Sequence, residues 1–115
     1  MCRYGDIYWA DVKGKQSIQS GRRPYLIVAN DCMNRFSNMT SAIPLSTSRK
    51  KPKLPTHVLI KGCGLAVPSM VLAEQVTILC QSDLQGRIGS ILGSGYEESV
   101  KLALRIQLNL LDDEK

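Results

Sequence analysis

The chain has 115 residues, of which 43% are hydrophobic, and its formal net charge is +5. This length and composition predict one folded domain, residues 1–115, and argue against disorder. The apolar runs are too short to cross a bilayer, and the start MCRYGDIYW has no signal-peptide core, so we expect a cytoplasmic protein.

The charge is distributed unevenly along the chain. Residues 13–61 contain ten Lys or Arg and a single acidic residue, Asp31, whereas acidic residues outnumber basic ones in the rest. A strongly basic half is typical of a surface that binds a polyanion. The alternative is a solvated basic face that has no partner.

Hydrophobic periodicity predicts a series of short strands. The alternating pattern of 7–12 indicates a first strand, and the apolar run 24–30 indicates a second strand buried on both faces. A turn or short helical piece follows at 31–38. Further strands are expected at 40–46, 55–60 and 70–79, with a tight turn at 62–65 and a turn of helix plus a short strand over 82–92. Pro44 predicts that the third strand lies at an edge or contains a bulge.

The C-terminal region changes to a helical period over about 95–111. Ser94 and Glu97 fit a capping box, with Ser94 as N-cap. Apolar residues surround more than half of this helix, so it can pack on the sheet and also face a partner. The elements together predict a mainly β protein with a C-terminal helix, arranged as a small barrel or a strongly curved sheet.

The sequence contains none of the common motifs for nucleotide, metalloprotease or serine-hydrolase chemistry. It has one histidine, no carboxylate cluster, and four cysteines without metal-ligand or redox spacing, so we expect no metal and no cofactor. Arginine and hydroxyl side chains suit RNA cleavage by the RNA's own 2′-hydroxyl, because the enzyme then needs only to bind phosphate and move protons.

Arg23 and the run 46–48 each lie where a predicted strand meets a basic loop. Arg23 is therefore a candidate phosphate-binding residue. The alternative is a surface arginine that pairs with an acid such as Asp31 or Glu74.

Several segments in order resemble the MazF/PemK family of bacterial toxins. They are GDIYWAD (5–11), GRRPYLIVAND (21–31), IPLST (43–47), LPTHVLI (54–60) and VLAEQV (71–76). The resemblance implies an SH3-like barrel of the CcdB/MazF type that forms a homodimer. It also implies the toxin of a toxin–antitoxin system, which cleaves single-stranded RNA selectively and without metal, and whose antitoxin is acidic and partly disordered.

The resemblance also implies site residues. The family's catalytic arginine falls on Arg23 and its catalytic threonine on Ser46, with Thr47 as an auxiliary hydroxyl. His57 and Glu74 are further auxiliary candidates; His57 has a structural role as its alternative. The expected RNA-binding residues lie in the two basic loops and beside them: Gln19, Arg22, Arg49, Lys50, Lys51 and Lys53.

Two positions depart from the family pattern. Ile18 stands where many members have glutamate, and Thr77 stands where many have arginine. These departures leave open a nuclease-dead module that binds RNA or antitoxin. A toxin of the same fold that targets a protein, as the gyrase poisons do, is a further alternative; the acidic end LLDDEK argues against it.

Overall fold

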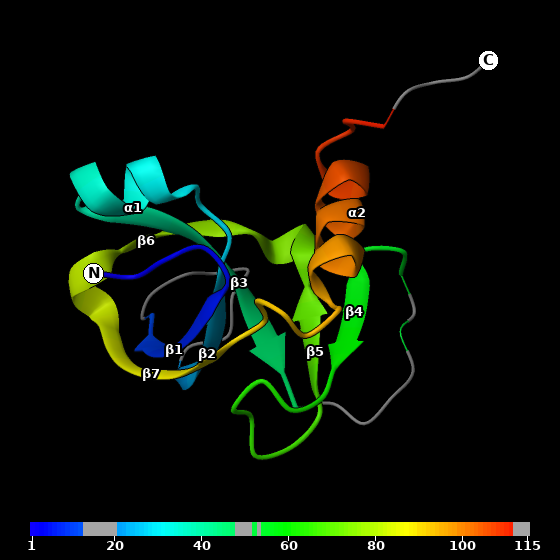
Figure 1. Ribbon diagram of the computed structural model, residues 1–115, viewed down its shortest axis with the longest axis horizontal. Helices are drawn as coiled ribbons and strands as arrows, with labels where there is room; N and C mark the ends of the chain where they lie inside the picture. The colour runs from blue at the N-terminus through cyan, green and yellow to red at the C-terminus, as the bar shows by residue number, and fades with distance from the viewer. Residues whose placement is uncertain (13–20, 48–51, 53, 112–115) are drawn as a thin grey trace.

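The computed structural model describes residues 1–12, 21–47, 52 and 54–111. Its strands are β1 (Asp6–Asp11), β2 (Arg22–Ile27), β3 (Met39–Ser46), β4 (His57–Ile60), β5 (Ser69–Leu72), β6 (Thr77–Cys80) and β7 (Leu84–Ser90). Its helices are α1 (Asp31–Phe36) and α2 (Glu97–Gln107), with short 3-10 helices η1 (Ala73–Gln75) and η2 (Gln81–Asp83). Figure 1 shows α2 standing beside β4 and η1, as the contacts of these elements require.

All strand pairs are antiparallel, and β3 is the central strand. The sheet order is β4-β5-β3-β2-β1-β7, and β6 pairs with the first half of β3. The end of β3, Leu45–Ser46, pairs with β5 instead. Pro44 lies between these two stretches and pairs with Tyr25 of β2. Because β3 is a central strand and its pairing with β2 shows no register shift up to Pro44, the expectation that Pro44 marks an edge strand or a bulge is wrong.

The predicted class, mainly β with a C-terminal helix, is confirmed, but the described strands number seven instead of five or six. No ladder between described strands closes the sheet into a complete barrel. Instead η2 joins β6, which pairs with β3, to β7, which pairs with β1. The chain itself therefore bridges the two sides of the curved β3-β2-β1 sheet.

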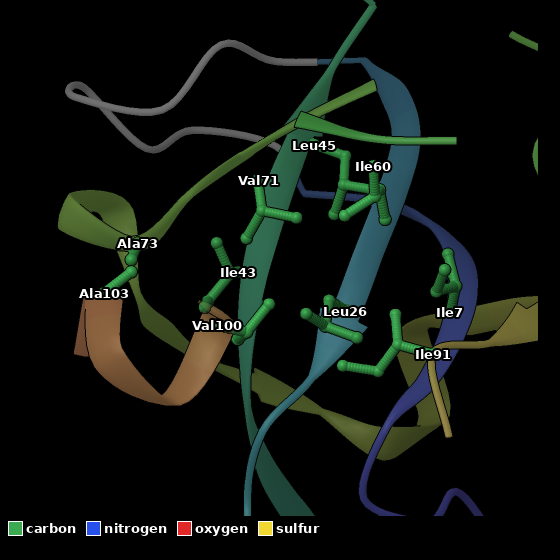
Figure 2. Packing of buried hydrophobic residues seen from close by; sticks show 10 residues of the cluster. All are labelled: Ile7, Leu26, Ile43, Leu45, Ile60, Val71, Ala73, Ile91, Val100 and Ala103. Atoms are coloured by element: carbon green, nitrogen blue, oxygen red, sulfur yellow. The ribbon is translucent and has the colours of Figure 1, made fainter. Parts of the chain in front are cut away.

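Strand β2 is buried on both faces, as its apolar run predicts. On one face Leu26 packs with Ile7 and Ile43 in a cluster that extends to Val100 of α2, as Figure 2 shows. On the other face Tyr25 and Ile27 pack in a second cluster. The other buried members of that cluster are Cys2, Ala10, Val12, Ala42 and Leu79.

The segment 70–79 is not one strand, in contrast to the expectation. It divides into β5, η1 and β6, because β5 and β6 pair with different parts of β3 and the chain must turn between them. Ala73 of η1 and Ala103 of α2 are both buried in the first cluster (Figure 2). Their small side chains allow the turn and the helix to approach closely.

Helix α2 is shorter than the predicted 95–111. Ser94 Oγ accepts the Tyr96 N–H at 3.2 Å and the Glu97 carboxylate accepts the Gly93 N–H at 3.0 Å. The N-cap is nevertheless Tyr96, whose side chain makes no capping hydrogen bond, and Glu97 is the first helical residue, so the expectation of a capping box with Ser94 as N-cap is wrong. Asn109, with φ of 58°, ends the helix, and the Leu110 N–H donates to the Arg105 carbonyl at 2.7 Å. This is the Schellman pattern. None of the described helices has the length and apolar character needed to span a membrane.

Candidate functional site

Arg23 and Ser46 lie on neighbouring strands at the same end of the sheet. The pairs Ile27–Ala42, Leu26–Ile43 and Tyr25–Pro44 follow one another without a bulge. Arg23 and Ser46 each lie two residues beyond the Tyr25–Pro44 pair, so both fall on the face that carries Tyr25. The register thus brings a guanidinium and a hydroxyl to one face of the two strand ends.

The adjacent arginines belong to opposite faces of β2. Arg22 Nε donates to Gln85 Oε1 at 2.8 Å, and the Arg22 guanidinium lies 4.3 Å from the centre of the Trp9 ring. Arg23 instead pairs with Ala10 in the β1–β2 ladder, on the Tyr25 face. Arg22 is therefore held by β1 and by the neighbouring Gln85 of β7, away from the face of Arg23.

Thr47, the auxiliary hydroxyl of the sequence prediction, lies beside a groove. A groove of about 290 Å³ is lined by Thr47, Pro24, Trp9, Arg87 and the turn after β4. A second groove, about 570 Å³, continues from Thr47 past Leu59 and Lys61. Alternation along β3 puts Ser46 on the Arg23 face and Thr47 on the groove side. Of the two hydroxyls, Ser46 is the one that shares a face with Arg23.

Two glycines let the turn at 62–65 form the wall of this groove. The Leu65 N–H donates to the Gly62 carbonyl at 2.9 Å, so the predicted tight turn is present. A Cβ on Gly64 would collide with the Ile88 carbonyl, and a Cβ on Gly89 would collide with the Cys63 carbonyl. The turn and β7 therefore touch backbone to backbone. The wall made by Leu65, Ala66 and Val67 depends on this contact.

His57 and Glu74 form a separate cluster at the other end of β4 and β5. Glu74 Oε2 lies 2.9 Å from His57 Nε2, and Thr56 Oγ1 donates to Glu74 Oε1 at 2.8 Å. Burial by itself raises the pKa of Glu74, but the hydrogen bonds from Thr56 and His57 outweigh it, so the pKa lies below its ordinary value. The structure thus pairs Glu74 with Thr56 and His57 instead of Arg23. These contacts fit the hydrogen-bonding role among the alternatives for His57.

Several predicted residues lie outside the described part of the chain. They are Ile18, Gln19, Arg49, Lys50, Lys51 and Lys53. Thr77 is described, and it lines a groove between β6 and α2 together with Val76, Leu104 and Leu108. Asp31 accepts the Tyr4 N–H at 2.7 Å, so it shapes the start of α1. Within the described ranges, no three His, Cys, Asp or Glu side chains gather as metal ligands.

The sequence argument missed Trp9, Lys61 and Arg87 as groove residues. Arg87 Nε donates to Asp6 Oδ1 at 3.2 Å, while its side chain remains about half exposed. Arg87 follows an ordinary strand pattern and belongs to no motif. Only the pairing of β7 with β1 brings it to Trp9, so no signal in the sequence marks it.

The fold and the paired strand ends define a class, namely a small mainly β protein with a basic residue and a hydroxyl at one end of its central strands. Residues 3–108 match the family model described as PemK-like, MazF-like toxin of type II toxin–antitoxin system. The chain belongs to this family, as the resemblance predicted.

Individual relatives agree with this assignment. The chain is 37% identical over 111 residues to "Endoribonuclease EndoA" of Bacillus subtilis (strain 168), covering 94% of this chain and 95% of that protein. A mycobacterial endoribonuclease solved with its cognate antitoxin superposes with a TM-score of 0.81 at 24% identity, covering 98% of this chain and 100% of that one. MazF-mt6 of Mycobacterium tuberculosis superposes with a TM-score of 0.76 at 24% identity, covering 94% of this chain and 99% of that one. At these identities the two structures show the shared fold.

Proposed function

We propose that this chain is the toxin of a type II toxin–antitoxin pair and acts as an endoribonuclease on single-stranded RNA. The family assignment and the Bacillus relative named an endoribonuclease support this activity. The observation that carries the proposal is the position of Arg23 and Ser46, two residues beyond the Tyr25–Pro44 pair on one face. Since messenger RNA lies in the cytoplasm, the toxin acts there.

In the proposed reaction the RNA supplies its own nucleophile. The 2′-oxygen attacks the adjacent phosphorus and loses its proton, the bond from phosphorus to the 5′-oxygen breaks, and that oxygen gains a proton. The products are a 2′,3′-cyclic phosphate and a 5′-hydroxyl. Arg23 binds the non-bridging oxygens through two N–H donors and assists proton transfer, and Ser46 donates a hydrogen bond to the developing charge. No step requires a metal.

The remaining basic residues bind the RNA on either side of the scissile phosphate. Arg22, fixed against Trp9, is an auxiliary phosphate contact next to the groove of Thr47. Gln19 and the loop residues Arg49, Lys50, Lys51 and Lys53 complete the basic surface. Base selection depends on these loops together with the groove. The antitoxin, an acidic and partly disordered chain, covers the same basic surface.

A second copy of this chain completes the proposed homodimer through α2. Leu102 and Leu108 of the α2 region and Ile78 of β6 are each about half exposed, and an apolar groove of about 450 Å³ lies between α2 and β6. Exposed apolar residues gathered around one helix are typical of a protein interface. The apolar residues that surround more than half of this helix in the sequence fit the same conclusion.

The test is cleavage of a long single-stranded RNA in EDTA, with the ends mapped, by the wild type and by Arg23→Ala. We expect discrete cuts from the wild type and none from the variant, with both proteins equally folded by circular dichroism. Cutting by Arg23→Ala at the wild-type rate would contradict the role of Arg23. Tight RNA binding without cuts would instead identify a nuclease-dead module. If the protein neither binds nor cuts the RNA, the protein-targeting toxin is the alternative that remains.

A further inference from the structure

Trp9 is the only tryptophan of the chain, and its partly exposed ring borders the groove beside Thr47. The Arg22 guanidinium lies 4.3 Å from the centre of the ring, and Arg22 Nε donates to Gln85 Oε1 at 2.8 Å. Arg22 is not among the residues that line the groove. The groove is therefore bordered by a part of the indole that Arg22 does not cover, while the stack with Arg22 fixes the orientation of the ring.

The groove begins next to the two proposed catalytic residues. Pro24 and Thr47 line it, and they follow Arg23 and Ser46 directly in the chain. Thr47 also lines the second groove, of about 570 Å³, which leads to Lys61. An RNA strand that crosses the ends of β2 and β3 therefore meets the groove one residue away from the scissile phosphate.

The lining of the two grooves fits a nucleobase and the phosphates beside it. The walls are largely apolar, and the charged residues among the described lining, Lys61 and Arg87, are both basic. An aromatic ring next to basic side chains is the usual binding surface for a single-stranded nucleic acid, because every base has a flat face that stacks. The smaller groove, about 290 Å³, lies at the lower end of the volumes that small ligands occupy.

We propose that the groove beside Thr47 is a base-binding subsite, in which Trp9 stacks on a base that flanks the scissile phosphate. The inference rests on the proposed function, since the RNA must cross Arg23 and Ser46 for the flanking base to reach the groove. Arg22 already holds the indole in the free protein, so stacking needs little ordering of the ring. Because stacking tolerates every base, Trp9 supplies affinity and fixes the position of the strand, and polar contacts choose the sequence.

The first experiment measures the fluorescence of Trp9, which reports on the groove because the chain has no other tryptophan. The probe is an RNA oligonucleotide that contains the strongest cut mapped on a long transcript. A single 2′-deoxy sugar on the 5′ side of the scissile phosphate prevents cleavage, and the anisotropy of a dye on the oligonucleotide follows binding independently. We expect the RNA to quench Trp9 over the same concentrations at which the anisotropy rises.

The second experiment removes one partner of the stack at a time. A series of these oligonucleotides carries one abasic nucleotide, placed at each position around the cut in turn. At one flanking position we expect the missing base to weaken wild-type binding about tenfold. The same change should weaken binding by Trp9→Leu much less, because the stack is already lost, and Trp9→Phe should retain most of the wild-type affinity.

The matched control is Phe36→Leu. It removes an exposed aromatic ring on α1, which precedes the start of β3, whereas Ser46 and Thr47 lie at the end of that strand. Phe36→Leu should bind every oligonucleotide as the wild type does. The fluorescence titration needs no variant, so it tests the subsite even if Trp9→Leu fails to fold.

Unchanged Trp9 fluorescence at saturating RNA would overturn the inference, and an apolar side chain of a protein partner would then be the better occupant of the groove. Equal abasic losses for the wild type and Trp9→Leu at every position would also overturn it, as would the same loss of affinity in Phe36→Leu. If the wild type cuts RNA and Arg23→Ala does not, such results remove only the base-binding subsite. If the wild type does not cut RNA, the proposed function fails and the inference with it.

Discussion

Glu74 is a partly buried carboxylate. Two neighbouring side chains hold it in place: His57, the first residue of β4, and Thr56, the residue before it. Thr56 donates to one oxygen and His57 lies at hydrogen-bond distance from the other. Despite burial, which acts in the opposite direction, these contacts lower the pKa of Glu74. A carboxylate with a lowered pKa stabilises the folded state above its unfolded pKa, and this contribution disappears as pH falls through the folded pKa.

Glu74→Gln should therefore lower the free energy of unfolding by about 1 kcal/mol near neutral pH. The difference from the wild type should shrink as the pH falls below about 4.5, the ordinary pKa of glutamate. Urea unfolding across this pH range measures the difference in unfolding free energy between the variant and the wild type. Glu98→Gln is the control, because Glu98 is exposed and pairs with Lys101 only at 3.8 Å. A difference that does not change with pH would contradict the claim that the lowered pKa of Glu74 stabilises the fold.

Ser46 is the second residue whose role has a direct test. Serine lacks the methyl group that restrains χ1 of threonine, so its hydroxyl is less firmly aimed. Ser46→Ala should lower the cleavage rate about a hundredfold, as loss of one donor to a developing oxyanion does elsewhere, and Ser46→Thr should retain or raise it. Single-turnover cleavage of the mapped oligonucleotide measures both. Equal rates for Ser46→Ala and the wild type would transfer the role to another hydroxyl.

Among the elements, the turn at 62–65 and strand β7 approach each other backbone to backbone. A Cβ on Gly89 would meet the Cys63 carbonyl, and backbone cannot move aside as a flexible side chain can. A Cβ on Gly86, in the same strand, would meet no atom within 4 Å. Gly89→Ala should therefore cost about 2 kcal/mol or more in unfolding free energy, while Gly86→Ala should be close to neutral. If denaturant unfolding gives the same loss of free energy for Gly89→Ala and Gly86→Ala, the backbone contact between β7 and the turn does not hold the groove wall.

Local patterns predicted the parts of the fold that local forces decide. The apolar run of β2 and the strand-end positions of Arg23 and Ser46 were evident from the sequence. The division of 70–79 was not, because it follows from which part of β3 each half joins. The partners of Glu74 and the groove position of Arg87 were missed for the same reason, since long-range pairing decides both.

At the scale of the whole molecule, the proposed homodimer depends on the outer face of α2. Leu108→Glu would place a charge in the apolar groove between α2 and β6, and charges are unfavourable in a buried interface. We expect light scattering after gel filtration to show two chains for the wild type and one for this variant. Leu92→Glu, equally exposed but outside that groove, should stay dimeric. A monomeric wild type would contradict the proposed dimer.

The most direct test of the account is a chemical change in the RNA itself. Once the cut is mapped, the oligonucleotide is made with a single 2′-deoxy sugar on the 5′ side of the scissile phosphate, and both versions are incubated with the wild type in EDTA. The account predicts complete resistance of the deoxy version, cleavage of the all-ribose version, and a 2′,3′-cyclic phosphate on its product. Cleavage of the deoxy version at the all-ribose rate would contradict attack by the 2′-hydroxyl, and with it the roles proposed for Arg23 and Ser46.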